Sequence, residues 1–171
     1  MRPKRPHLAV VALGGWGGSS IAALEIAHAM SALADVSIVA PRPIRRALTS
    51  RLRRLDHDGA DPVPQRLATL HRQRPLDAIH VHFLSPLLGA CLRAVAAWPA
   101  PRPTVSAIAH GSDVAGPSAA PLPDAATRHV ARWIAPSQAL AARAGSLEPQ
   151  RPFEIIPNGV DLTRFRPRSL L

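Results

Sequence analysis

The stretch Leu8-Ala9-Val10-Val11-Ala12-Leu13-Gly14-Gly15-Trp16-Gly17-Gly18 decides the fold class of this 171-residue chain. Residues 8–13 form a continuous apolar run, which is typical of a strand buried on both faces of a parallel sheet. Four glycines in five positions then predict a loop, and Ser19 and Ser20 are suited to cap a following helix. A second apolar run covers residues 36–40. Strand, loop, helix and strand in this order predict a crossover between parallel strands.

The same alternation continues along the chain. Further strands are expected over residues 78–81, 104–109, 133–135 and 153–156. Helices are expected over residues 19–33, 44–55, 63–73, 87–97, 124–131 and 138–144. Ser137 should cap the last helix and Gly145 should end it. Alternating strands and helices predict an α/β fold, namely a Rossmann-like three-layer sandwich with a mainly parallel sheet.

The net charge of +10 permits anionic partners. All but one of the 21 basic residues are arginine, and alanine and proline are also abundant, so the charge is interpreted as a bias of the whole composition. Three phenylalanines, three tryptophans and no tyrosine offer few stacking platforms, which argues against nucleic acid as a partner. The arginine cluster within residues 42–54 is interpreted either as a solvated helix face or as a weak contact to anionic lipid. Arg42 directly follows a strand end, so it is a candidate contact for an anionic acceptor.

The sequence has no apolar run long enough to cross a bilayer and no signal-peptide pattern. We therefore expect a cytoplasmic location, with the inner membrane face as the place of any peripheral contact. The single cysteine, Cys91, excludes an internal disulfide and fits a reducing compartment. Its apolar helical surroundings predict a small buried side chain.

Three chemically distinctive segments, residues 14–18, 81–85 and 110–113, follow predicted strands. In open α/β sheets, ligands bind beyond the carboxyl ends of the strands. The glycine loop and the helix N-terminus after it predict a contact to phosphate or sugar, against the alternative of a tight structural turn. A dinucleotide fingerprint fails because Ser20 stands at its third glycine, and a Walker loop fails because it lacks a lysine.

His80 and His82 are two residues apart on a predicted strand, so their side chains face the same side. With His110 nearby, a three-histidine metal site is one interpretation, although no carboxylate or cysteine cluster supports it. The other interpretation places one histidine in the core and one in the lining of a crevice. His110 can donate to a sugar hydroxyl or a phosphate oxygen. Asp113 can accept from a hydroxyl or cap the following turn.

Four segments, in this order and spacing over nearly the whole chain, resemble glycosyltransferase family 4 of the GT-B type, which has two Rossmann-like domains. They are Gly14-Gly15-Trp16-Gly17-Gly18, Asp77-Ala78-Ile79-His80-Val81-His82, His110-Gly111-Ser112-Asp113, and Ile155-Ile156-Pro157-Asn158-Gly159-Val160-Asp161 with Phe165-Arg166-Pro167. The last segment is the most specific, because in the family it closes the N-terminal domain and leads into the second.

The resemblance implies one half of a GT-B fold. Residues 1–165 would form the N-terminal, acceptor-side domain and residues 166–171 a truncated interdomain linker, with the C-terminal donor-binding domain absent. It also implies retaining transfer of a sugar from a nucleotide-diphosphate donor, as co-substrate, without a metal or other cofactor. The acceptor would be a glycan, a glycolipid or a small molecule.

The resemblance also assigns roles to the candidate residues. Gly15, Gly17 and Gly18 would lie against the donor diphosphate or an acceptor phosphate, and His110 beside the donor sugar as the catalytic residue. His82 and Asp113 would line the acceptor side. Trp16 departs from the smaller or polar residues common in such loops, so it is a candidate acceptor platform or lid.

Two hypotheses on activity follow. The chain is either the acceptor-binding half of a glycosyltransferase, nearly inactive without a C-terminal domain, or a stand-alone module that binds sugar or phosphate without catalysis. In the first case it is either a truncated gene product or one partner of a split enzyme whose C-terminal domain is a separate chain. Catalysis of this type needs both domains to close on the substrates and stabilise the leaving diphosphate.

Overall fold

The computed structural model describes residues 4–12, 17–40, 53–54, 63–115, 127–147 and 151–159. The described strands form one seven-stranded sheet in which every neighbouring pair is parallel. They are β1 (His7–Val11), β2 (Asp35–Val39), β3 (Arg53–Arg54), β4 (Ala78–His82), β5 (Thr104–Ile108), β6 (Val130–Ala135) and β7 (Phe153–Ile155). The expected α/β, Rossmann-like fold is therefore confirmed.

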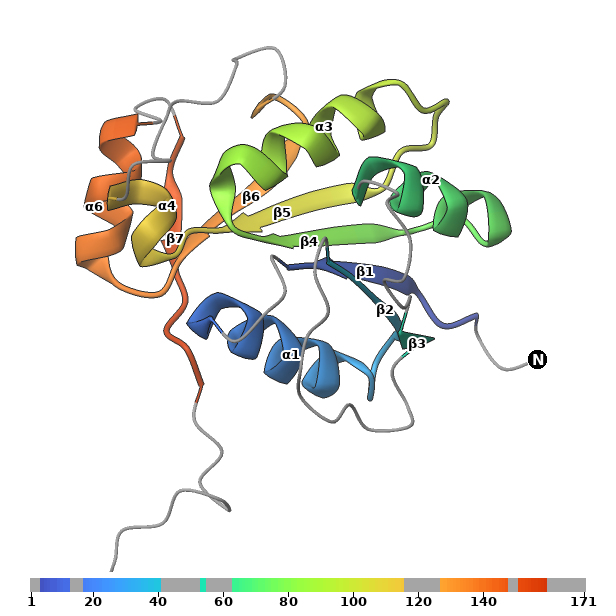
Figure 1. The fold of residues 1–171 in the computed structure, drawn as a ribbon, viewed down its shortest axis with the longest axis horizontal. Helices are drawn as coiled ribbons and strands as arrows, with labels where there is room; N and C mark the ends of the chain where they lie inside the picture. The colour runs from blue at the N-terminus through green and yellow to red at the C-terminus, as the bar shows by residue number, and fades with distance from the viewer. Residues whose placement is uncertain are drawn as a thin grey trace, which may run out of the picture.

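Helices cover both faces of this sheet (Figure 1). The described helices are α1 (Gly18–Met30), α2 (Val63–Gln73), α3 (Gly89–Ala96), α4 (Gly111–Ala115) and α6 (Gln138–Leu147), and a π-helical turn, η1 (Leu84–Leu88), leads into α3. In Figure 1, α2 and α3 lie above the sheet and α1 lies below it, while α4 and α6 lie at the end near β7. No described helix meets the length and hydropathy needed to span a membrane.

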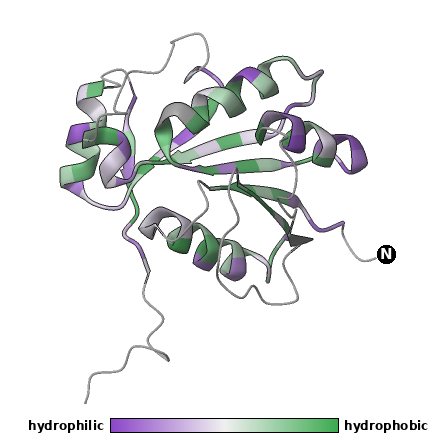
Figure 2. Cartoon of the chain, in the orientation of Figure 1, coloured by the Kyte–Doolittle hydropathy of each residue, from purple (hydrophilic) through white to green (hydrophobic). Residues whose placement is uncertain are grey.

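Alternation along the strands builds two separate cores. On β1, Ala9 and Val11 face the larger core, which contains the buried residues of α2 and α3. Leu8 and Val10 face the smaller core, which contains the buried residues of α1. Successive strand side chains point to opposite faces, so a continuous apolar run serves both cores. The strands of the described sheet are accordingly hydrophobic, and polar residues lie mainly on the outer faces of the helices (Figure 2).

The strand order β3-β2-β1-β4-β5-β6-β7 reverses direction between β1 and β4. The chain leaves β1 towards β2 on one side, and it later leaves β4 towards β5 on the other. Connections that diverge in this way open a crevice outside the carboxyl ends of the strands, where ligands of such sheets bind. The topology therefore places the start of α1 and the residues after β4 on either side of one crevice.

Three helix boundaries differ from the sequence-based expectation. The cap of α1 is Gly17, and no side chain caps this end, whereas Ser20 is buried inside the helix. The helix expected from residue 87 is preceded by the π-helical turn η1, which begins at Leu84, two residues after the end of β4. Gly145 lies within α6 rather than ending it. Leu147 packs against the core, and this contact offsets the roughly 1 kcal/mol that glycine costs inside a helix.

Four strand residues, in two pairs, were expected to be helical. Val130 and Ala131 belong to β6, and the partner of Val130 is Val105 of β5, so sheet pairing overrides the helical pattern. Arg53 and Arg54 form β3 beside β2 instead of ending a basic helix. The rest of the expected helices over residues 44–55 and 124–131 lies largely outside the described residues.

The expected cap of α6 is present, because the Leu140 amide donates to Ser137 Oγ at 3.2 Å. Replacing Ser137 by alanine should lower the free energy of unfolding by about 1 kcal/mol, since an amide of the first turn loses its acceptor. Urea unfolding checks this. Ser146→Ala, at an exposed serine near the end of the same helix, is the matched control and should change stability by less than about 0.5 kcal/mol. Equal effects of the two substitutions would contradict the capping role.

Candidate functional site

A pocket of about 520 Å³ lies at the carboxyl ends of the strands, within the range of small-molecule sites. It joins the start of α1, the residue after β4, the start of α4 and the residues around α6 and β7. Its described lining residues are Gly17, Gly18, Ser19, Phe83, His110, Gly111, Ser112, Pro136, Leu140 and Asn158. The pocket therefore occupies the crevice that the strand order predicts.

The N-terminus of α1 forms one wall of the pocket. Gly17 is the cap residue in an extended conformation, no side-chain cap bond is present, and the first turn contains no acidic residue. The first amides of a helix have no acceptor within the helix and carry a partial positive charge. Gly18 and Ser19 thus bring amide donors to the pocket in a position suited to an anion or a hydroxyl.

Three histidines next to the pocket are in contact and form a histidine cluster. His80 and His82 extend from the same face of β4, with ring centroids 4.7 Å apart and the rings nearly perpendicular. The rings of His82 and His110 are stacked, with Nδ1 of His82 3.2 Å from Nε2 of His110. His80 Nδ1 lies 2.8 Å from Ser106 Oγ on β5, its partner in register. Of the three, only His110 lines the pocket.

Burial keeps these histidines neutral. It lowers the pKa of His82 from 6.5 to about 2, with a smaller contribution from the neighbouring histidines. It also lowers the pKa of His80 to about 4. The pKa of His110 is lowered by burial as well. At neutral pH, each ring therefore has one N–H and one lone pair, and His110 meets a ligand as an uncharged group.

Asp113 joins the two loops that carry this wall. Its side chain is 1% exposed, and its carboxylate accepts hydrogen bonds from the amides of His110, at 2.7 Å, and Leu84, at 2.9 Å. Burial raises the pKa of this carboxyl, while the two backbone donors oppose that rise. Asp113 thus fixes the end of β5 against the start of η1, and it holds the backbone of His110 in place.

Phe83, directly after β4, has a φ of 115°. A bulky residue with positive φ is a true outlier, and such strain costs about 1–3 kcal/mol. The Phe83 amide still donates to the carbonyl of Ile108 at 3.2 Å, so the strained residue stays attached to the neighbouring strand. Backbone strain of this kind gathers at functional sites, and Phe83 lines the pocket.

The three-histidine metal interpretation finds no support in the arrangement of ligands. Within the part of the chain that the structure describes, no group of three or more His, Cys, Asp or Glu side chains is placed to hold a metal ion. Two of the facing nitrogens, His82 Nδ1 and His110 Nε2, are directed at each other instead. Cys91 is buried in the core, as expected, and takes no part in the site.

The structure brings together part of the predicted site. The prediction that the glycine loop and His110 share one cleft is confirmed for Gly17 and Gly18. His82 and Asp113 lie behind the pocket wall rather than in it, since both are buried and hydrogen-bonded to the His110 segment. A direct substrate contact from either of them remains a prediction. Gly15, Trp16 and Arg42 lie outside the described residues.

Several lining residues were missed by the sequence analysis. Phe83 lies in segment 81–85, which the rule that ligands bind beyond strand ends indicated, but the sequence assigned it no role of its own. Asn158 belongs to a segment that the analysis treated only as the end of a domain. Ser19 was treated only as a cap. Leu140 carries no chemical signal in the sequence, because only the packing of α6 brings it to the pocket.

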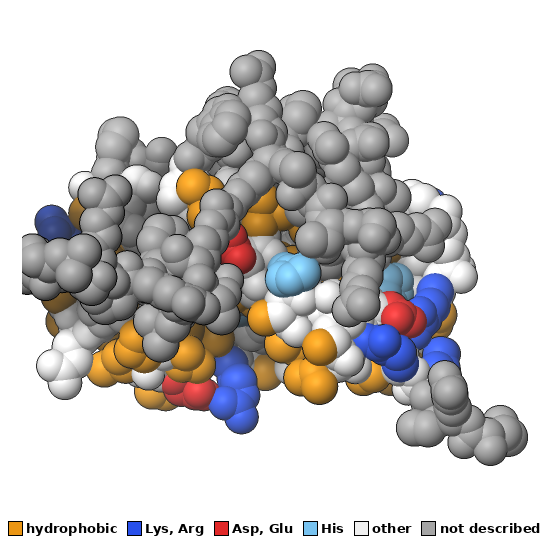
Figure 3. Space-filling view, turned by 90° about the horizontal axis from the view of Figure 1, so that it is seen from below, with side chains coloured by type: hydrophobic (Ala, Val, Ile, Leu, Met, Phe, Trp, Pro, Cys, Tyr) orange, Lys and Arg blue, Asp and Glu red, His pale blue; other side chains and the backbone are white. Residues whose placement is uncertain are grey.

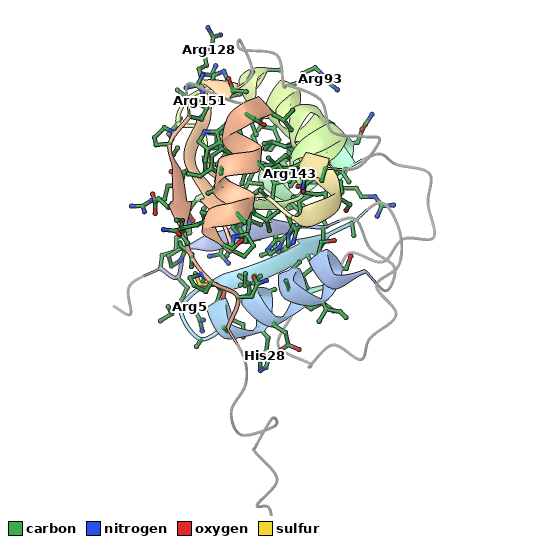
Figure 4. The ribbon with its side chains drawn as sticks, turned by 90° about the vertical axis from the view of Figure 1, so that its left-hand side faces the viewer. Arg5, His28, Arg93, Arg128, Arg143 and Arg151 are labelled. Atoms are coloured by element: carbon green, nitrogen blue, oxygen red, sulfur yellow. The ribbon has the colours of Figure 1, made fainter. Side chains whose placement is uncertain are left out.

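Basic side chains outside the pocket are spread over the molecule. Arg128 and Arg151, before β6 and β7, lie close together, whereas Arg93 on α3 and Arg143 on α6 lie apart from them and from each other (Figure 4). On the face viewed from below, acidic and basic side chains lie next to one another (Figure 3), and the described ion pairs Arg5–Asp35, Arg74–Asp35 and Arg132–Glu154 have this character. The described arginines therefore agree with a bias of the whole composition.

We compared the sequence with models of known protein families. The family model described as Glycosyltransferase Family 4 matches residues 16–164, which is most of the chain. The chain belongs to glycosyltransferase family 4. The matched region contains α1, the histidine cluster, Asp113 and β7, so the whole described pocket lies within the family 4 domain. A search of curated proteins found no match to this family 4 chain.

Proposed function

We propose that this chain is the acceptor-side domain of a retaining glycosyltransferase that takes its sugar from a nucleotide-diphosphate donor. The observation that carries the proposal is that one pocket joins the N-terminal amides of α1 to the imidazole of His110. In this proposal, donor and acceptor meet in that pocket, and the acceptor is a glycan, a glycolipid or a small molecule. The nucleotide sugar is a co-substrate, and no further cofactor is needed.

The chemistry of the lining supports a sugar ligand. Ser19, Ser112 and Asn158 offer hydroxyl and amide groups that can exchange hydrogen bonds with sugar hydroxyls. Phe83 and Leu140 offer apolar surface for the C–H face of a sugar ring. Ligand sites commonly combine mainly apolar walls with a few placed polar groups, which is the pattern of this pocket.

The start of α1 supports a phosphate contact. Its amides are suited to the donor diphosphate or to an acceptor phosphate, because both are anions and the helix dipole favours negative charge there. His110 then lies across the pocket, beside the sugar that is transferred. Catalysis in this proposal is electrostatic: donors held in place before the reaction stabilise the charge that develops on the leaving diphosphate.

One observation favours the second candidate function, a binding module without catalysis. None of the described lining residues is an arginine or lysine, and burial keeps His110 neutral. A leaving diphosphate carries more negative charge than the amides of α1 alone can offset. Without such charge the described pocket is suited to binding alone. For the first candidate function, we infer that the positive charge needed for transfer comes from groups outside the described lining, supplied by a second domain.

The chain by itself should therefore transfer little or no sugar. We expect turnover at least about 100-fold below the roughly 1–10³ per second that is usual for enzymes, since loss of one donor to the developing charge already costs that much. The measurement is sugar release and transfer from radiolabelled UDP-glucose and GDP-mannose by the purified chain. Steady transfer without a partner would contradict this prediction.

Both candidate functions require that the chain binds its ligand, and this can be measured directly. Calorimetric titration with the same two nucleotide sugars should detect binding that His110→Ala weakens at least about 10-fold, because a hydrogen bond to the ligand is lost. His28→Ala, at an exposed histidine on α1, is the control and should leave affinity unchanged. If both variants bind like the unmodified chain, His110 does not contact the ligand.

A further inference from the structure

His82 has no contact with the pocket, yet it forms the only described side-chain contact to a ring nitrogen of His110. Its side chain is fully buried, at 0% exposed. Among the described residues, Nε2 of His82 is one of two buried side-chain nitrogens without a hydrogen-bond partner. One ring nitrogen of His82 faces His110 and the other has no partner, and this difference determines which nitrogen carries the proton of the neutral ring.

The facing pair allows two arrangements of protons. Both rings are neutral, so one nitrogen of the 3.2 Å contact donates and the other accepts. In the first arrangement, Nδ1–H of His82 donates to Nε2 of His110, and the unpartnered Nε2 of His82 is a lone pair. In the second, Nε2–H of His110 donates, and His82 then holds its own N–H on the buried, unpartnered Nε2.

In the first arrangement, the buried group without a partner is a lone pair, which costs less free energy than a buried N–H without an acceptor. Buried N–H donors without an acceptor are rare in proteins, and under-satisfied acceptors are more common. Since the pair offers a choice, the proton of His82 belongs on Nδ1. His110 then has its proton on Nδ1. That nitrogen has no described hydrogen-bond partner and is not among the fully buried unpartnered atoms, so it is exposed, and His110 is a residue that lines the pocket.

We propose that His82 is a positioning residue that donates Nδ1–H to Nε2 of His110 and so fixes His110 as the tautomer with its proton on Nδ1. His110 thereby faces the pocket as a hydrogen-bond donor rather than as a base. The tautomer of His110 is a property of the free protein. Its use towards a sugar hydroxyl or phosphate oxygen rests on the proposed function.

The tautomer is measured directly by nitrogen NMR of the chain labelled with ¹⁵N-histidine at neutral pH, with His110 assigned by its absence from the His110→Gln spectrum. A neutral imidazole shows distinct shifts for its protonated and its bare nitrogen. We expect Nδ1 of His110 to carry the proton in the unmodified protein. A proton on Nε2 of His110 would overturn the proposal without any variant.

Substitutions at two neighbouring histidines test the cause. His82→Asn keeps an N–H donor near the position of Nδ1, so His110 should keep the same tautomer. His82→Leu removes the donor, and both tautomers of His110 should then be populated. His80→Asn is the matched control, because His80 lies on the same face of β4 but bonds to Ser106, so it should leave the tautomer of His110 unchanged. Thermal unfolding shows that each variant is folded.

A single, unchanged tautomer of His110 in folded His82→Leu would also overturn the proposal. Addition of UDP-glucose or GDP-mannose to the labelled protein then tests the proposed function separately. If neither sugar moves the His110 signals while the tautomer still depends on residue 82, the positioning role stands and the proposed function fails. If the sugars move the His110 signals but Nε2 of His110 holds the proton, the proposed function stands and the positioning role fails.

Discussion

Replacing Asp113 by alanine should lower the free energy of unfolding by about 4 kcal/mol, because each of the two backbone donors left without an acceptor costs roughly 1–3 kcal/mol. The carboxylate is 1% exposed, so water does not reach the amides of Leu84 and His110 in its place. Asp113→Asn keeps one carbonyl oxygen and should cost about half as much. Urea unfolding at pH 7 measures both.

Ser112→Ala is the matched control for Asp113. Ser112 is the preceding residue of α4 and is exposed to the pocket, so its loss should change stability by less than about 0.5 kcal/mol. If Asp113→Ala unfolds at the same urea concentration as this control, the carboxylate does not hold the two loops together. In that case, its predicted direct contact with the acceptor would become the better explanation of Asp113.

Lowering the pH from 7 to 5 should destabilise the protein by about 3–4 kcal/mol through His80 and His82 alone. Their pKa values, about 4 and about 2, lie below the ordinary value of 6.5. As the pH falls below about 6.5, the unfolded chain binds protons at both residues and the folded chain does not. Stability therefore falls with pH, and each histidine contributes about 2 kcal/mol by pH 5.

To test this prediction, the variants are compared by how much free energy of unfolding each loses between pH 7 and pH 5, not by their stability at one pH. His80→Asn and His82→Asn should each reduce the loss between pH 7 and pH 5 by about 2 kcal/mol, because one titrating group is removed. Replacing His28 on the exposed face of α1 is the control and should leave most of the loss in place. A loss that persists in full when His80 and His82 are both replaced would show that other groups cause acid unfolding.

Six of the seven described strands could be predicted from the sequence, because the relevant signals are local; β3 was the exception. The apolar run of residues 8–13 and the glycines after it indicate a buried parallel strand and a crossover, and the structure has β1 and α1 at these positions. The spacing of His80 and His82 predicted a shared face, and their rings are in contact. Strand ends indicated where His110 and the glycine loop would meet, since parallel strands end at one edge of the sheet.

Sequence reasoning failed where distant contacts decide the outcome. Asp113 was a candidate ligand residue, and only the structure shows that the amide of Leu84, 29 residues away, meets its carboxylate. The positive φ of Phe83 has no signal in the sequence, because phenylalanine is among the residues least suited to it. Val130 and Ala131 resembled a helix until pairing with β5 placed them in the sheet.

The pairing of β1 with both β2 and β4 has a consequence during synthesis of the chain. One side of β1 finds its partner soon, after a single helix, but the other side waits for a segment about 70 residues downstream, as the bond from the His7 amide to Asp77 illustrates. Until that segment leaves the ribosome, a nascent apolar strand has an open edge, which is the kind of surface that promotes aggregation. The rate of translation and the presence of a holding chaperone at this stage should therefore affect the yield of folded protein more than the final stability of the domain does.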